Sequence, residues 1–118
     1  MPPHWPRKLS AALGLQPEGQ DWEIENADPD RIEEFVAFYE MNEVEDPWEP
    51  EALAELVFAS ADEAMGEREL TDPERRAVLR FVAGYGGEFP DALAYWRSLP
   101  VGEFPVAALV REGGVRAA

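Results

Sequence analysis

The chain has 118 residues, of which 25 are Asp or Glu and ten are Lys or Arg, so its formal net charge is −15 at pH 7. Hydrophobic residues make up 46% of the chain and aromatic residues 11%, which excludes an intrinsically disordered protein and is enough for one domain with a core. Because there is no cysteine, a disulfide framework, a cysteine zinc site and thiol catalysis are excluded.

No targeting segment is evident in the sequence. Two bases near the N-terminus precede only a short apolar stretch, residues 9–15, which Ser and Gly interrupt. This pattern is not that of a signal peptide, and no apolar run reaches the length of a membrane span. We therefore expect a cytoplasmic protein without membrane contact, with a single acidic helical domain over residues 1–118 and flexible ends at 1–6 and 115–118.

The N-terminal part of the chain predicts one short helix and an irregular segment. The helix is expected over residues 7–13 and ends at Gly14. Trp22 and Ile24 then alternate with acids, and a period of two is typical of a strand. The sequence therefore allows a minor β element near residues 21–25.

A longer helix is predicted over residues 29–41. Asp28 suits the N-cap position and Pro29 the first helical position, where proline is common. The apolar residues recur at intervals of three and four, which places them on one buried stripe. A loop that contains Asp46 and Pro47 follows this helix.

A second strong helix is predicted over residues 50–65, ending at Gly66. Its apolar residues form a core-facing stripe. Glu51, Glu55 and Asp62 fall together on the other side, which we expect to face solvent.

The second half of the chain carries clear helix-start signals. Thr71 and Glu74 have the spacing of a capping box, and the helix that they open is predicted to end in the glycine-rich residues 84–87. Further short helices are expected over residues 90–99 and 105–111, the last ended by two glycines. The expected fold is all-α, a small bundle of four to five short helices. Its predicted core consists of Ile32, Phe35, Val36, Tyr39, Leu53, Leu56, Val57, Val78, Phe81, Leu93 and Trp96.

The acids are concentrated in one segment. Residues 18–69 hold 19 acids and two bases, Arg31 and Arg68. Such a field opposes compaction by self-repulsion and favours encounter with a cationic partner. We therefore expect the protein to bind something basic, and another protein is the leading candidate.

The predicted binding surface combines acids with one aromatic anchor, Trp48, because an acidic rim around an aromatic side chain is a common interface pattern. Two simpler interpretations stay open: the acids are only solvated, and Trp48 packs back onto the helix that follows it. Whether Phe58 is exposed also stays open. The predicted partner-binding residues are Glu43, Glu45, Asp46, Trp48, Glu49, Glu51, Glu55 and Asp62.

Catalytic and metal chemistry find little support in the sequence. His4 is the one histidine, so a catalytic triad with Ser60 would require it to fold back onto the chain. We expect Ser60 to be a small residue in a helix contact. The carboxylates lack the spacing of a calcium loop, and nothing singles out two of them for acid–base work. The expectation is a protein that is not an enzyme and has no metal and no cofactor.

Direct contact with nucleic acid is also disfavoured, because the net charge opposes a phosphate backbone. Three arginines on the helix after Thr71 nevertheless form a small basic group. We expect these arginines, Arg75, Arg76 and Arg80, to pair with acids of the helix over residues 50–65.

Part of the chain resembles a known class of proteins. Residues 95–111, which run from Tyr95-Trp96 to Phe104-Pro105-Val106 and on to Arg111, together with Leu53–Ala64 resemble small acidic bacterial immunity-type proteins. The resemblance implies a helical, non-catalytic inhibitor that neutralises a toxin made by the same cell, with acids and aromatics set against the basic face of a nuclease. It identifies no contact residue.

On this hypothesis the acids occupy a cationic groove of the toxin or nuclease, and replacing Glu51, Glu55 and Asp62 by Lys abolishes binding with the fold intact. One alternative is an accessory or adaptor subunit of a larger bacterial assembly that docks through an apolar C-terminal face. Another is mimicry of DNA, which the irregular spacing of the acids disfavours. The residues of the apolar C-terminal face are Phe89, Phe104, Val106 and Leu109.

Overall fold

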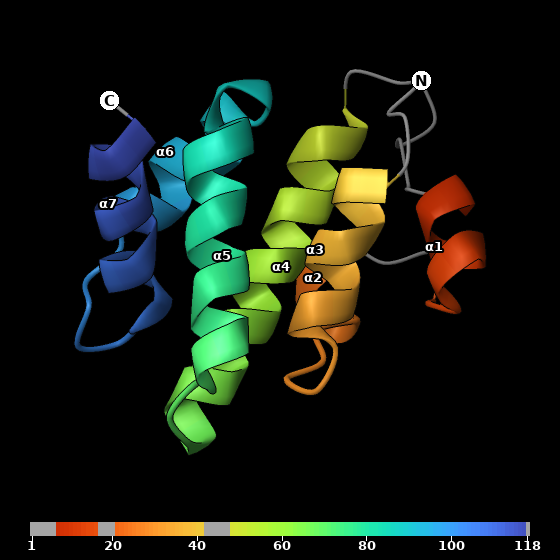
Figure 1. Ribbon diagram of the computed structural model, residues 1–118. Helices are drawn as coiled ribbons and strands as arrows, with labels where there is room; N and C mark the ends of the chain where they lie inside the picture. Colours follow the sequence, from red (N-terminus) through yellow and green to blue (C-terminus); the bar gives the residue numbers. More distant parts are fainter. Residues whose placement is uncertain (1–6, 17–20, 42–47, 118) are drawn as a thin grey trace.

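The computed structural model describes residues 7–16, 21–41 and 48–117 of the protein (Figure 1). Its described part consists of helices joined by turns and loops, without a strand, which confirms the all-α prediction. The helices are more numerous than the four to five expected, since short segments also form helical turns. They are α1 (Arg7–Leu13), α2 (Trp22–Glu25), α3 (Ile32–Met41), α4 (Glu49–Glu67), α5 (Asp72–Tyr85), α6 (Pro90–Ser98) and α7 (Val106–Ala117), with a 3-10 turn η1 (Gly86–Glu88).

The predicted minor β element is wrong, because residues 22–25 form the single-turn helix α2. Two side-chain contacts hold this turn. Asn26 Nδ2 donates to the carbonyl oxygen of Gln16 at 3.0 Å, and Trp22 Nε1 donates to Ser10 Oγ of α1 at 2.9 Å. The alternation of Trp22 with acids therefore reflects one buried side chain on a helical turn, with Ile24 left exposed.

The start of α3 was predicted three residues too early. Asp28 does not cap the helix, because its Oδ1 accepts a hydrogen bond from the backbone N–H of Asp30 at 2.9 Å. This contact closes a local turn around Pro29, and such turns compete with helix for Asp residues. The helix begins only at Ile32.

The start of α5 is as predicted. Thr71 accepts a hydrogen bond from the Glu74 N–H at 3.2 Å, and the Glu74 carboxylate accepts one from the Thr71 N–H at 2.9 Å. The capping box satisfies two donors that a helix start otherwise leaves unpaired. Arg68 adds an ion pair to Glu74 at 2.8 Å, which ties the end of α4 to this start.

Figure 1 shows α4 and α5 in the middle of the molecule, with α6 and α7 on one side and α3 and α1 on the other. Helix α5 contacts α7, α3 and α4, and α4 also contacts α2 and α6. Helices α4 and α5 are therefore each packed between neighbours on two sides, and both α6 and α7 pack against at least one of them.

Aromatic rings fill the centre of this arrangement. Phe81 and Phe89 stack with ring centroids 4.7 Å apart, and Tyr39 meets Phe81 edge to face at 5.0 Å. Phe58 lies beside Phe89 and is fully buried, which answers the question of its exposure. Of the predicted core, all residues are buried except Leu93, which is partly exposed.

Helix α7 extends beyond its predicted end. The two glycines at 113 and 114 were expected to stop it, but the helix runs on to Ala117. Gly113 is buried against α5, and a Cβ atom at this position would lie only 2.7 Å from Cβ of Val82. The glycine therefore permits a close helix contact here and does not end the helix.

We predict that Gly113→Ala destabilises the protein by about 1–3 kcal/mol, because the added methyl group overpacks the contact between α5 and α7. Gly84→Ala is the matched control: Gly84 also lies in a helix, but a Cβ there meets nothing within 4 Å. Urea unfolding followed by circular dichroism measures both variants. Equal stability of the two variants would contradict the close packing described for Gly113.

Candidate functional site

The residues predicted to bind a partner fall into three groups in the structure. Glu43, Glu45 and Asp46 lie outside the described residues. Trp48 is half-buried directly before α4, and its carbonyl oxygen accepts a hydrogen bond from the Ala52 N–H at 3.0 Å. Glu49 is 6% exposed. Trp48 and Glu49 thus lie at the start of α4, where Trp48 is partly exposed and Glu49 is buried.

The third group consists of Glu51, Glu55 and Asp62, which we call the inner acids. All three lie on the side of α4 that faces α6 and the start of α7. The carboxylate of Glu51 accepts hydrogen bonds from the backbone N–H groups of Asp91 at 3.0 Å and Ala92 at 2.6 Å. These N–H groups are in the first turn of α6, where no intrahelical acceptor exists. Glu51 therefore caps a helix that is 40 residues away in the sequence.

The other two inner acids have comparable partners. Glu55 Oε2 accepts a hydrogen bond from Trp96 Nε1 of α6 at 2.6 Å. Asp62 Oδ1 accepts one from the N–H of Val106, the first residue of α7, at 3.2 Å. A carboxylate at a helix N-terminus also interacts favourably with the helix dipole. Helix α4 thus anchors both α6 and α7 through its acids.

All three acids are partly exposed, so the expectation that they face solvent holds only in part. A carboxylate on an amphipathic helix can either be hydrated or accept hydrogen bonds from the start of another helix. The sequence of α4 alone does not distinguish these two roles. The distinguishing signal lies elsewhere in the chain, because the residues directly before α6 and α7 are Phe89 and Pro105, and neither offers the side-chain oxygen of a Ser, Thr, Asp or Asn N-cap.

Two of the three arginines of α5, Arg75 and Arg80, form internal ion pairs, but with other helices than α4. Arg75 forms an ion pair with Glu112 of α7 at 2.7 Å, and Arg80 forms one with Glu40 of α3 at 2.8 Å. The predicted partner helix was wrong for these two arginines, because their guanidinium groups meet acids of α7 and α3. These arginines therefore hold α5 between its two neighbours.

The apolar C-terminal face considered for an adaptor is largely inside the protein. Phe89, Val106 and Leu109 are fully buried or nearly so. Only Phe104 is partly exposed. Docking through these four residues as one open face is therefore wrong.

An open groove with apolar walls lies between α2, α4 and α6, and we call it the α2–α6 groove. It consists of two adjoining hollows of about 300 and 400 Å³ that share Ile24, Trp96 and Phe104. Ile24 is 62% exposed, and Tyr95 on the groove wall is 55% exposed. Trp96 forms the link to the core, since its ring lies 6.2 Å from that of Phe58.

The rim of the groove is acidic. Glu23, Glu55, Asp62 and Glu63 line it, and none of the lining residues is basic. Burial raises the pKa of Glu55, the hydrogen bond from Trp96 opposes this, and the charges of Glu23 and Glu51 raise the pKa further. Burial also raises the pKa of Asp62. Both carboxylates are thus held where the surroundings disfavour their negative charge.

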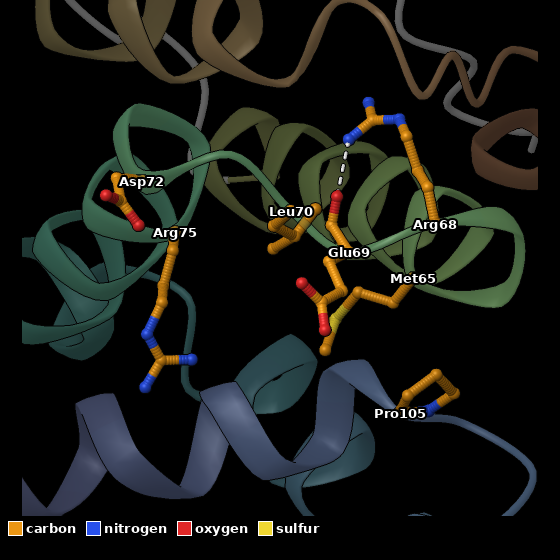
Figure 2. A pocket seen from close by; sticks show the side chains of 7 residues that line it. All are labelled: Met65, Arg68, Glu69, Leu70, Asp72, Arg75 and Pro105. Carbon is orange, nitrogen blue, oxygen red and sulfur yellow. Dashed lines mark hydrogen bonds between the residues drawn. The ribbon is translucent and has the colours of Figure 1, made fainter.

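A second cavity lies between the end of α4, the start of α5 and Pro105 (Figure 2). Its volume is about 390 Å³, and its charged side chains come in both signs. Arg75 already pairs with Glu112, and Arg68 pairs with Glu74 and donates to the carbonyl oxygen of Glu69 at 3.1 Å, the bond drawn in Figure 2. Because its arginines are engaged and its charges are mixed, this cavity selects for neither sign of ligand.

Comparison of the chain with protein-family models, with curated proteins and with solved structures gave no match. Among the described residues, no group of three or more His, Asp or Glu side chains is placed to hold a metal ion. None of the described helices combines the length and the apolar character needed to cross a bilayer. Sequence reasoning missed Ile24 and Tyr95 as surface features, because their exposure depends on how α2 and α6 pack.

We predict that replacing the inner acids by Ala (Glu51→Ala, Glu55→Ala and Asp62→Ala together) destabilises the fold by several kcal/mol. The starts of α6 and α7 lose their acceptors, each lost helix cap costs about 0.5–2 kcal/mol, and the partly buried Trp96 indole also loses its acceptor. Replacement by Lys would be worse, because it also places cations at helix N-termini. The charge-matched control is Glu33→Ala, Glu67→Ala and Glu69→Ala, at three exposed positions. Urea unfolding of both triple variants tests this, and equal stabilities would show that the inner acids are dispensable.

Two single variants are predicted to change the pH dependence of stability in opposite directions. The pKa of Glu55 is raised in the folded protein, so the contribution of this carboxylate to stability is lost as pH rises above the ordinary pKa of Glu. The stability of the Glu55→Gln variant should therefore increase relative to wild type over that pH range. Arg68 holds the pKa of Glu74 at about 2, so its stabilisation is present above pH 4.5 and is lost as pH falls towards 2. Glu74→Gln should therefore be least stable, relative to wild type, at neutral pH.

Denaturant unfolding over a pH series measures both differences. A Glu55→Gln variant that loses stability relative to wild type as pH rises would contradict the burial of that carboxylate. A flat difference for Glu74→Gln would contradict its ion pair with Arg68.

Proposed function

We propose that the protein is a non-catalytic binding protein of the immunity or inhibitor type, which occludes the cationic surface of a basic partner such as a toxin or nuclease. The observation that carries the proposal is the excess of 15 acids over bases. Even if every base paired with one acid, this excess would remain. The protein therefore keeps an anionic surface that it cannot neutralise by itself.

The two bases of the acidic segment illustrate this shortage. Arg31 pairs with Glu34 at 2.5 Å, and Arg68 pairs with Glu74 at 2.8 Å. Both guanidinium groups also donate to backbone carbonyl oxygens, that of Leu13 for Arg31 and that of Pro29 for Arg68. These arginines are thus engaged in holding helices together, and each forms an ion pair with only one of the 19 acids of residues 18–69.

The acids that we propose for the first contact with a partner lie outside the set predicted from the sequence. The inner acids hold α6 and α7, whereas Glu33, Glu67 and Glu69 are exposed and we call them the outer acids. The bond from Arg68 to the carbonyl oxygen of Pro29, at 2.8 Å, brings the end of α4 next to the segment that leads into α3. We infer that an anionic surface at these helix ends makes the first contact with the basic partner, because steering depends on exposed charge.

The first test is a pull-down from lysate of the source cells at low ionic strength, followed by elution with a salt gradient and mass spectrometry. We expect a basic protein that is released as salt rises, since screening shortens the reach of exposed charges. If that protein is a nuclease, adding the purified acidic protein should suppress its activity in proportion to the amount bound. A partner retained through high salt would contradict electrostatic occlusion.

The variant that tests the surface is Glu33→Ala, Glu67→Ala and Glu69→Ala. We predict that association with the captured basic protein slows by about tenfold at low salt and that this difference shrinks at high salt. Stopped-flow mixing measures the association rate, and circular dichroism checks the fold. An unchanged rate in a folded variant would show that the outer acids do not steer the encounter.

A further inference from the structure

The α2–α6 groove combines exposed apolar side chains with an acidic rim. Ile24 and Tyr95 expose 62% and 55% of their surface, and both line the groove. Exposed apolar residues gathered at one concave site, with Trp96 and Phe104 between them, are typical of a binding surface. A ligand that covered Ile24 and Tyr95 would remove apolar area from water and gain free energy.

The charge of the groove restricts what that ligand can be. Its rim carries four carboxylates and no basic residue. Glu55 and Asp62 each use one oxygen for an internal donor, Trp96 Nε1 and the Val106 N–H. Among the described residues the second oxygen of each carboxylate has no hydrogen-bond donor, so it is available to a cation. A neutral or anionic ligand would bury these carboxylates without a counter-charge, which is unfavourable.

We propose that the α2–α6 groove binds a segment of a basic protein in which a Lys or Arg side chain adjoins an aliphatic side chain. This inference rests on the proposed function and names the part of the surface that gives it affinity. The aliphatic side chain covers Ile24 and Tyr95. The methylene stem of the basic residue lies along the aromatic floor, and its charged end meets the carboxylates of Glu55 and Asp62.

The outer acids and the α2–α6 groove act in two different steps of binding. The outer acids attract the partner over a distance, whereas the groove makes short-range contacts that exclude water. Groove contacts therefore act on the dissociation rate, and the outer acids act on the association rate.

The probe is a short synthetic peptide that alternates arginine and leucine. One control peptide replaces leucine by serine at the same charge, and another replaces arginine by glutamate. Binding is followed by titration in ¹H–¹⁵N spectra, with the indole N–H signal of Trp96 as reporter because this group lies in the groove and donates to Glu55. We expect the arginine–leucine peptide to shift this signal and to bind about tenfold more tightly than the arginine–serine peptide.

The variant Ile24→Ala with Tyr95→Ala should weaken binding of the arginine–leucine peptide by about tenfold and leave the arginine–serine peptide unaffected. Met41→Ala is the matched control, since Met41 is 83% exposed and does not line the groove. The comparison of peptides on the wild-type protein needs no variant, so the test holds even if the double variant is unstable.

Equal affinity for the arginine–leucine and arginine–serine peptides, or an unchanged Trp96 signal, would contradict peptide binding in the groove. Salt-dependent binding of both peptides would in that case still support the proposed function. Failure of both basic peptides to bind at low salt would count against the proposed function itself. Tight binding of the glutamate–leucine peptide would overturn the assigned charge of the ligand.

Discussion

The arrangement of the second half of the protein depends on hydrogen bonds from helix starts to carboxylates of α4. Glu51 accepts from the first turn of α6, and Asp62 accepts from the first residue of α7. Glu55, which lies between them on α4, accepts a hydrogen bond from the indole N–H of Trp96. Because α6 and α7 have no side-chain caps in their own flanking sequence, α4 supplies the acceptors, and the positions of the later helices follow from its length and register.

This constraint divides a uniformly acidic sequence into two functional classes. Acids that face α6 and α7 stabilise the fold, and their partners are N–H groups instead of bases. Acids on the outside have few bases to pair with, since the chain holds only ten. Self-repulsion among the outer acids costs stability, and a basic partner would relieve it. The α2–α6 groove lies where the two classes meet, because Glu55 and Asp62 belong to both the anchor and the rim.

Local signals in the sequence predicted much of the fold. The capping box of Thr71 and Glu74 and the apolar stripe of α3 depend on neighbours in sequence, so their pattern is sufficient. Long-range contacts were not predictable in the same way. From the sequence, Gly113 indicates a helix end, and only the structure shows that it lies against Val82. In the same way the sequence indicates a solvated Glu55, and only the structure shows its hydrogen bond with Trp96. The partners of Glu51, Glu55 and Asp62 were not predictable for the same reason, since the exposure of a side chain depends on tertiary packing.

Amide hydrogen exchange at the starts of α6 and α7 tests the central role of α4 most directly. The first N–H groups of a helix have no intrahelical acceptor and normally exchange quickly. If Glu51 and Asp62 hold these helices, the amides of Ala92 and Val106 should exchange slowly, at rates close to those of interior helical amides. Exchange of both amides at the rate of an unprotected chain would contradict the account.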